Sequence, residues 1–424
     1  MATKYTRGEV DDLKLFIAIA TTLVLFGCSR ADPAAAQHTG GASSWYRAVV
    51  SSDDHIEAVF LLRVPAGRGT ASFKVGSHEI ISDATFEHGK LDIPMPIHQT
   101  VVEAVAQPDG SLVGTFVTRS RVLGASTLSL RATPIVAPTS AALRTVTNKG
   151  AAVTLAEPRT SWRLAMAESG DAKLTLTETG PGSFDGVVSF DTGNLIHISG
   201  NGGGDDIVMT GFDGTSGYRL ELALSKDRAT ANGKLFAGQR FDWRETFLAT
   251  RGANFTLPLK LRATTPNGKV VLPDLPELAK LPQGPLLVEL AASWCSTCRN
   301  AAPFIGQLDR EYRAKGLTVV TLLYEFTDDA NADAKQAALY KQMYNVTWLV
   351  VPVPGSLDDF AEIVPTGLSD LNAGGFPVSL FLAPDRTLVA VHAGFPAADD
   401  DPTAFATVTA EFRANVEKLL AMPR

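Results

Sequence analysis

The sequence contains little cysteine and no excess of positive charge. Its 424 residues include only three cysteines, Cys28, Cys295 and Cys298, which are too few for a small secreted fold held together by several disulfides. Lys and Arg number 38 against 45 Asp and Glu, which gives a net charge of −7. Because no basic surface is available to attract phosphates, we expect no nucleic-acid partner.

The seven histidines form no metal-binding pattern. None of them pairs with another at a spacing of three or four residues, and none lies beside a cysteine, so we expect neither a zinc site nor any other metal. The hydrophobic fraction of 45% and the charged fraction of 20% are those of a folded protein. A chain of this length predicts two to three domains.

An apolar run near the N-terminus ends at the first cysteine. Residues 13–27 are mostly apolar, too few to span a bilayer but enough for the core of a signal peptide. The run Leu25–Cys28 resembles the bacterial lipobox, which implies a lipid on Cys28. We predict a lipoprotein signal peptide over 1–28 and a flexible tether, rich in Ala, Gly, Ser and Pro, over 29–44. An uncleaved anchor helix or a plain signal peptide would also export the chain, to the periplasmic side of the inner or outer membrane.

The next half of the chain is β-rich. Residues 45–257 alternate apolar and polar positions between regularly spaced turn residues, a pattern that predicts an all-β antiparallel sandwich or barrel. The stretches that begin at Gly114 and Gly233 resemble each other. We interpret them as marking two similar halves, 45–145 and 158–257, either as two subdomains or as parts of one barrel; a chance similarity of two hairpins is the alternative.

Residues 258–424 change to alternating strands and helices, which predicts an α/β domain. A buried strand over 285–292 leads to Cys295 and Cys298 at the start of a helix. The helix dipole and the free N–H groups there favour a thiolate and lower a thiol pKa from about 8.5 to about 3.5–7.5. Cys295 is the predicted nucleophile and Cys298, one turn later, the resolving thiol. Half a zinc site and a structural disulfide are the alternatives.

Three sequence features resemble a known fold. They are Trp294–Cys298, Pro303 within the following helix, and Gly375–Pro377 before a strand. Over residues 284–396 the chain is similar to thioredoxin, and more narrowly to exported thiol-disulfide oxidoreductases of the TlpA/ResA type. The resemblance implies that Pro377 has a cis peptide bond, faces the cysteines and helps to dock a peptide; an ordinary trans proline is the alternative.

Two further residues belong to the candidate site. Glu289 lies six residues before Cys295 in an apolar strand, where thioredoxins place a buried acid. Burial would raise its pKa and let it take the proton of Cys298; an outward-facing glutamate is the alternative. Trp294 is expected to shield the sulfurs and to line the docking surface.

These features predict an exported, membrane-tethered oxidoreductase that reduces protein disulfides and needs no cofactor beyond the Cys295–Cys298 pair. Its expected partners are a protein disulfide substrate, by resemblance apocytochrome c or another envelope protein, and a membrane or envelope thiol donor. Because Ser296 and Thr297 replace a Pro-containing pair, the direction stays open. One alternative is a peroxiredoxin-like peroxidase, although Ala292 stands where peroxiredoxins have a threonine. The other is a non-catalytic envelope-binding lipoprotein that uses the thioredoxin unit as a scaffold.

Overall fold

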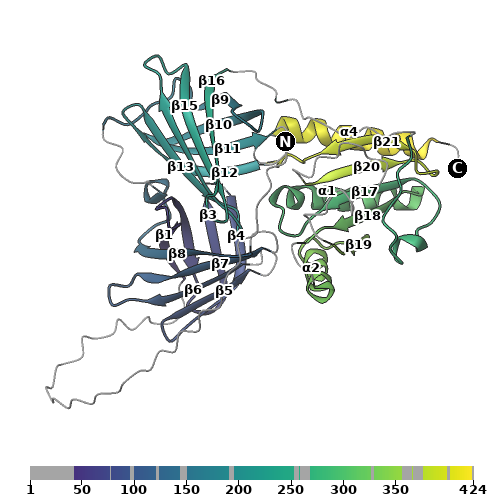
Figure 1. The fold of residues 1–424 in the computed structure, drawn as a ribbon, viewed down its shortest axis with the longest axis horizontal. Helices are drawn as coiled ribbons and strands as arrows, with labels where there is room; N and C mark the ends of the chain where they lie inside the picture. The colour runs from purple at the N-terminus through teal and green to yellow at the C-terminus, as the bar shows by residue number, and fades with distance from the viewer. Residues whose placement is uncertain are drawn as a thin grey trace, which may run out of the picture. The chain divides into compact units, whose positions relative to one another are not determined.

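Two antiparallel barrels precede an α/β domain along the chain (Figure 1). The computed structural model describes residues 43–422, except 77, 96–99, 121–123, 144–149, 191–194, 253–256, 258–267, 326–328, 356–364, 366–375 and 399–401. The predicted signal peptide and almost all of the predicted tether lie outside the described residues. The first strand begins at Ser44, the last residue of that tether.

The first barrel is a meander of eight strands in chain order, closed by pairing of its first and last strands. Its strands alternate buried and exposed residues, so that apolar side chains fill the interior. The strands are β1 (Ser44–Ser51), β2 (Glu57–Val64), β3 (Gly67–Val75), β4 (His78–Glu87), β5 (Lys90–Met95), β6 (Thr100–Ala106), β7 (Leu112–Ser120) and β8 (Gly124–Ile135).

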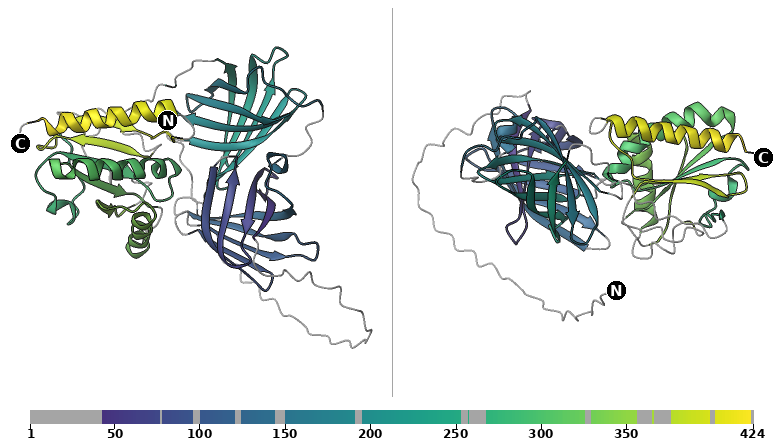
Figure 2. Two further views of the ribbon diagram at one scale, coloured as in Figure 1. Left: turned by 180° about the vertical axis from the view of Figure 1, so that it is seen from behind. Right: turned by 90° about the horizontal axis from the view of Figure 1, so that it is seen from above.

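The second barrel repeats this topology and closes by pairing of β16 with β9. Its strands are β9 (Arg159–Met166), β10 (Asp171–Gly180), β11 (Ser183–Phe190), β12 (Leu195–Gly203), β13 (Asp206–Phe212), β14 (Gly217–Leu224), β15 (Thr230–Gly238) and β16 (Trp243–Arg251). Both barrels are visible in Figure 2. The predicted all-β half is therefore confirmed, as two separate closed barrels.

The two glycines that suggested a repeat occupy the seventh strand of each barrel. A Cβ on Gly114 would lie 1.9 Å from the carbonyl oxygen of Glu103, and one on Gly233 would lie 2.1 Å from the ring of Phe247. Neither position has room for a side chain, because a neighbouring strand or ring already fills the space. The two similar stretches therefore share a glycine because the seventh strand of each barrel has no room for a side chain at that position.

The two barrels share buried contacts. The ring of Phe212 at the end of β13 packs among Phe60, Phe73 and Phe116 of the first barrel, with centroid distances of 5.0, 5.7 and 4.8 Å. The hydroxyl of Thr210 accepts a hydrogen bond from the backbone N–H of Val59 at 3.0 Å. Phe212 belongs to the same apolar cluster as the interior of the first barrel.

The C-terminal domain is built on a five-stranded mixed sheet of order β19-β18-β17-β20-β21. The first three strands are parallel to one another, β20 pairs antiparallel with β17, and β21 pairs antiparallel with β20. The strands are β17 (Leu286–Ala291), β18 (Thr318–Leu323), β19 (Leu349–Pro352), β20 (Val378–Leu382) and β21 (Leu388–Ala393). Every residue of β17 is buried, as expected for a central strand with both faces covered.

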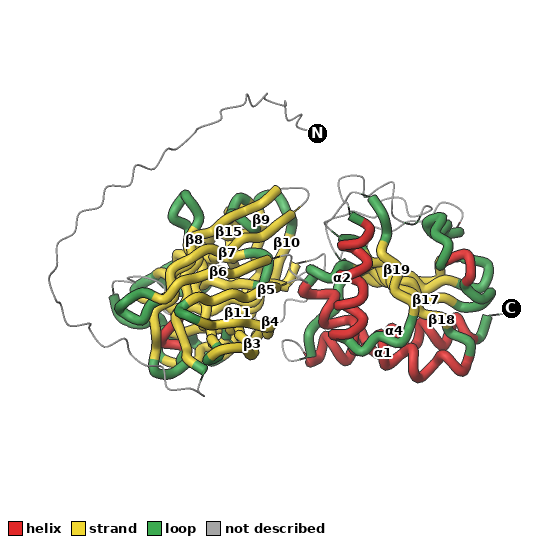
Figure 3. The backbone as a smooth tube through the Cα atoms, turned by 90° about the horizontal axis from the view of Figure 1, so that it is seen from below, coloured by secondary structure: helices red, strands yellow, loops and turns green. Residues whose placement is uncertain are grey.

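Helices cover both faces of this sheet (Figure 3). They are α1 (Ser296–Tyr312), α2 (Ala330–Met343) and α4 (Pro402–Leu420). The domain also has short 3-10 turns at Leu278–Lys280 and Arg313–Lys315, and a third such turn, Ser140–Leu143, lies between β8 and β9. Leu287 shares an apolar cluster with α1 and α4, whereas its neighbour Val288 shares one with α2. Because strand side chains alternate, α1 and α4 cover one face and α2 the other. The predicted α/β thioredoxin-like fold is confirmed.

Candidate active site

The cysteine pair lies where β17 leads into α1. Cys295 is the N-cap of α1, and its Sγ accepts a hydrogen bond from the backbone N–H of Cys298 at 3.0 Å. The two residues form a disulfide with their Cα atoms 5.3 Å apart. The sulfur of Cys295 therefore lies on the free N–H groups of the helix, where the dipole stabilises a thiolate once the disulfide is reduced.

The two sulfurs differ in their access to solvent. Cys295 is 7% exposed and Cys298 is fully buried. An incoming molecule would therefore meet the sulfur of Cys295 first. Its Sγ also lies 3.5 Å from the carbonyl oxygen of Phe376. The Phe376–Pro377 peptide bond is cis, and it brings the backbone before β20 beside the disulfide; Gly375 lies outside the described residues.

Aromatic side chains surround the disulfide. The half-buried Trp294 donates a hydrogen bond from Nε1 to the carbonyl oxygen of Tyr324 at 3.1 Å. Its ring meets the ring of Phe376 edge-on at 5.9 Å, and Tyr324 stacks on the same ring at 5.5 Å. The three rings form an apolar wall between the segment before Cys295 and the segment before β20.

Glu289 is fully buried in the middle of β17. Its Oε2 accepts a hydrogen bond from the hydroxyl of Thr321 at 3.1 Å, and that hydroxyl accepts one from Nε1 of Trp348 at 2.9 Å. No described residue pairs with its other oxygen, Oε1. Burial raises the pKa of Glu289 to about 8, although the bond from Thr321 lowers it.

The sheet register places Glu289 in a polar row under α1 and α4. Glu289 alternates with Leu287, whose side chain faces those helices. It pairs with Ser379 of β20, and Ser379 pairs with His392 of β21. His392 contacts the ring of Phe412 on α4 at 4.9 Å, and burial lowers its pKa to about 4. Glu289 thus lies on the face of the sheet that the cysteine-bearing helix covers.

A second buried acid, Glu325, was not predicted from the sequence. It follows β18 and is 3% exposed. Its carboxyl accepts hydrogen bonds from the N–H of Ser293 at 3.0 Å and from the hydroxyl of Ser293 at 2.8 Å. The sequence separation of 32 positions between Ser293 and Glu325 conceals this pairing in the sequence. The only sequence feature that could have indicated Glu325 is its position as an acid shortly after an apolar strand.

Other predicted features lie elsewhere in the chain. Cys28 lies outside the described residues. Within the described ranges, no group of three or more His, Cys, Asp or Glu side chains could hold a metal ion. The helices of that same part of the chain are all too short or too polar to cross a membrane.

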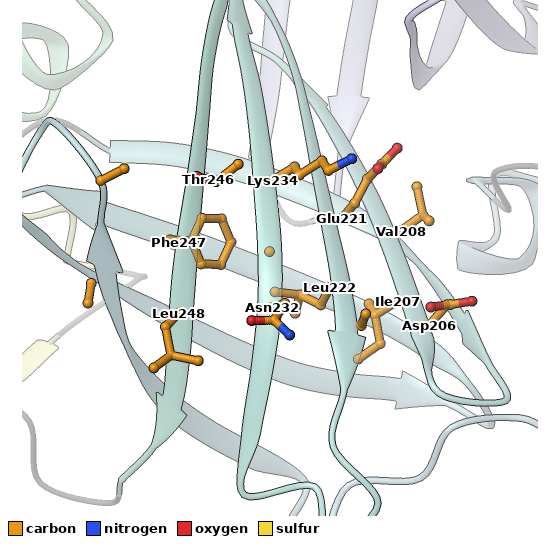
Figure 4. A pocket seen from close by; sticks show the side chains of 14 residues that line it. Asp206, Ile207, Val208, Glu221, Leu222, Asn232, Lys234, Thr246, Phe247 and Leu248 are labelled. Atoms are coloured by element: carbon orange, nitrogen blue, oxygen red, sulfur yellow. The ribbon is translucent and has the colours of Figure 1, made fainter.

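The second barrel carries a hollow of about 720 Å³ across strands β13 to β16 (Figure 4). Glu221 and Lys234 are paired neighbours on β14 and β15 and both border it, with Leu248 on β16. Neither cysteine nor histidine is among its lining residues.

Known proteins resemble the C-terminal part of the chain, while no family model matches it. The chain is 40% identical over 48 residues to thioredoxin Asp f 28 of Aspergillus fumigatus, a match that covers 11% of this chain and 44% of that protein. The chain thus spans less than half the length of this curated relative.

Solved structures similar to this chain match about a third of it. A thiol:disulfide interchange protein of the thioredoxin family from Chlorobium tepidum is 19% identical, with 34% of this chain and 84% of that chain covered and a TM-score of 0.24. A secreted disulfide oxidoreductase of Mycobacterium tuberculosis is 19% identical, with coverage of 33% and 86% and a TM-score of 0.23. A secreted thiol-disulfide isomerase of Corynebacterium glutamicum is 15% identical, with coverage of 38% and 98% and a TM-score of 0.25.

Proposed function

We propose that this protein is an exported, membrane-tethered thiol-disulfide oxidoreductase of the TlpA/ResA type that reduces protein disulfides. One observation carries the proposal. The more exposed sulfur of the pair, that of Cys295, lies at the N-terminus of α1 and accepts the N–H of Cys298 at 3.0 Å. A thiolate at this place is both stabilised and reachable, as a nucleophile must be.

The reaction is a pair of thiol-disulfide exchanges. The Cys295 thiolate attacks one sulfur of a substrate disulfide, which forms a mixed disulfide and releases the first substrate thiolate. The Cys298 thiol then loses its proton and attacks the sulfur of Cys295, which closes the Cys295–Cys298 disulfide and releases the second substrate thiolate. The substrate gains two electrons, and a thiol donor of the membrane or envelope returns two electrons to the protein.

Glu289 is the proton carrier for the second exchange in this proposal. With a pKa of about 8, a minority of Glu289 is ionised at pH 7, and this ionised form accepts a proton from Cys298 and releases it again. The position of Glu289 on the α1 side of the sheet, with one oxygen lacking a described partner, supports this role. An outward-facing glutamate, the alternative weighed from the sequence, does not fit its complete burial.

Trp294 and Pro377 form the docking surface in this proposal. Trp294, the half-buried member of the three rings, offers apolar contact to a peptide chain, while the buried Tyr324 and Phe376 support the cluster. The backbone before Pro377 lies beside Cys295, because the carbonyl oxygen of Phe376 is 3.5 Å from its sulfur. A peptide that pairs with this backbone would place its own disulfide at Cys295.

The proposal also covers the rest of the chain. Residues 1–28 are the signal peptide, Cys28 carries the lipid, and 29–44 form the tether. The domain limits are 45–257 for the β-rich part, with halves 45–145 and 158–257, and 258–424 for the redox domain. The barrels, whose interiors are packed with apolar side chains, serve to hold or position the redox domain.

Trapping of substrates tests the proposed function. In Cys298→Ala the mixed disulfide cannot be resolved, so Cys295 should remain bound to substrate and donor proteins, which mass spectrometry identifies. The matched control Cys295→Ser, Cys298→Ala should trap none. Absence of protein adducts in the native envelope would contradict a reductase. Rapid sulfenate formation at Cys295 in stopped-flow mixing with hydrogen peroxide would instead establish the peroxidase.

A further inference from the structure

The segment that delivers Cys295 to the site is tied to the end of β18. Glu325 receives two hydrogen bonds from Ser293, one from the backbone N–H and one from the hydroxyl. A third bond runs from Nε1 of Trp294 to the carbonyl oxygen of Tyr324. Two consecutive residues before the nucleophile are thus held by two consecutive residues after β18.

Among the described residues, the hydrogen bonds of Glu325 come from Ser293, which is fully buried and lies two residues before Cys295. The buried Asp333 lies near enough to Glu325 to raise its pKa further. Burying a carboxyl is unfavourable unless its hydrogen bonds compensate for lost water. A group kept at this cost beside a nucleophile is a candidate for a function at that site.

We propose that Glu325 is a positioning residue that holds the Ser293–Trp294 segment, and through it the sulfur of Cys295, against the N-terminus of α1. This inference rests on the proposed oxidoreductase function. Without the two bonds to Ser293, the segment between β17 and α1 is free to shift. The thiolate would then lose its alignment with the N–H of Cys298, and misplacement by about 1 Å can lower a rate by about a hundredfold.

The hydrogen-bond pattern specifies which substitutions preserve the contact. Burial raises the pKa of Glu325 to about 8, although both bonds from Ser293 lower it, so the protonated carboxyl dominates at pH 7. The carboxyl accepts the N–H of Ser293 with one oxygen and its hydroxyl with the other, and a serine hydroxyl can also accept a hydrogen bond. Glutamine offers an oxygen to the N–H and an amide NH2 group to the hydroxyl, whereas alanine offers neither.

The experiment compares Glu325→Ala and Glu325→Gln in the full-length protein. Disulfide reduction is followed with insulin and dithiothreitol, and reactivity of the reduced Cys295 with iodoacetamide. We expect Glu325→Ala to lower both rates by about tenfold to a hundredfold, and Glu325→Gln to restore both to within about twofold. Ser293→Ala, which removes one of the two bonds, should lower them by about fivefold.

A matched control separates positioning from stability. Glu245 of the second barrel is another buried carboxyl whose partners are a nearby turn, and Glu245→Ala should leave both rates unchanged. If Glu325 only stabilised the fold, Glu325→Ala would loosen the site and raise the iodoacetamide rate, which would overturn the proposal. An unchanged rate, or failure of Glu325→Gln to rescue a folded protein, would overturn it equally. Inactivity of the unaltered protein toward disulfides would instead refute the oxidoreductase function.

Discussion

Two buried glutamates, one in a barrel and one in the redox domain, differ in how many hydrogen bonds their carboxyl groups accept. Glu245 in β16 accepts three hydrogen bonds from the turn after β9, two from the N–H groups of Glu168 and Ser169 and one from the Ser169 hydroxyl. Glu289 in β17 accepts one, from Thr321, and no described residue pairs with its Oε1. The barrel uses its acid to fix a turn, whereas the redox domain keeps an acid with unused hydrogen-bonding capacity.

This difference extends to the two regions as a whole. Both barrels are closed by strand pairing and carry clusters of apolar side chains, which favours a single rigid structure. The redox domain buries a disulfide and two acids, Glu289 and Glu325, each with a pKa near 8. Groups that are unfavourable to bury and able to exchange protons near neutral pH are common at active sites, which supports the function proposed for this domain.

The largest expected effect is on activity. Cys295→Ser removes the nucleophile, because a serine hydroxyl is not ionised near neutral pH and cannot form a disulfide. We expect insulin reduction to fall to the uncatalysed background while both barrels stay folded, as measured by circular dichroism. The control Cys28→Ser should keep full activity and lose only membrane attachment. Residual activity in Cys295→Ser would place the chemistry outside the predicted pair.

The second prediction concerns pH and Glu289. Glu289 has a pKa of about 8 in the folded state, against the usual carboxyl value of 4.5. Between pH 4.5 and pH 8 the folded state therefore keeps a proton on Glu289 that the unfolded state has lost. The stability that this proton confers is therefore present at low pH and lost as pH rises to 8. The loss amounts to about 5 kcal/mol at most, from about 1.4 kcal/mol per pKa unit. Glu289→Gln keeps the bond from Thr321 and removes this dependence.

Denaturant unfolding of the redox domain at pH 5 and pH 8 measures the effect. The glutamine variant should gain stability relative to the unaltered protein as pH rises, because it has no carboxyl at position 289 to lose a proton. Glu325 titrates equally in both proteins, so its contribution cancels from the difference. Its rate of disulfide closure after mixed-disulfide formation should fall. Parallel pH profiles of stability for the two proteins would show that Glu289 is not a buried acid of raised pKa.

The sequence predicted the fold well where local patterns determine it. Period-two alternation identified the β-rich half, and the strand before Cys295 with the helix after it lie within a few residues of β17 and α1. The number of barrels could not be read from that alternation, because closure depends on pairing between strands such as β1 and β8 that are far apart in the chain.

Most of the predicted site lies along a short stretch of chain, and only the resemblance indicated the distant Pro377, whose peptide bond is cis. Trp294, Cys295 and Cys298 are close in sequence, so their spacing revealed them. Glu325 was missed because its contact with Ser293 exists only through the parallel pairing of β17 with β18. Glu289 has two cross-strand neighbours, Thr321 and Ser379. Their positions likewise follow from strand register and not from any sequence motif.

The third prediction tests whether the barrels act as one folded unit that is separate from the chemistry. Phe212 is 2% exposed and contacts three rings of the first barrel. Phe212→Ala should lower the free energy of unfolding by about 3–5 kcal/mol, as other substitutions that leave a large cavity do. It should leave the rate of insulin reduction unchanged. The control is Trp243→Ala, which removes a more exposed aromatic residue of the same barrel. It should lower the free energy of unfolding by less than about 1 kcal/mol. A loss of activity in Phe212→Ala would show that the barrels contribute to the reaction.

The smallest expected effect concerns Glu245. Glu245→Ala leaves the donors of Glu168 and Ser169 without their acceptor, but both residues are exposed, so water can replace part of the lost bonding. We expect a cost of about 1–2 kcal/mol in denaturant unfolding. Glu245→Gln keeps an acceptor for both N–H groups and should recover most of it. Neither variant should change insulin reduction, because the carboxyl serves only its turn. A change in that rate would remove the distinction between a structural acid in the barrel and the acids proposed to act in the C-terminal domain.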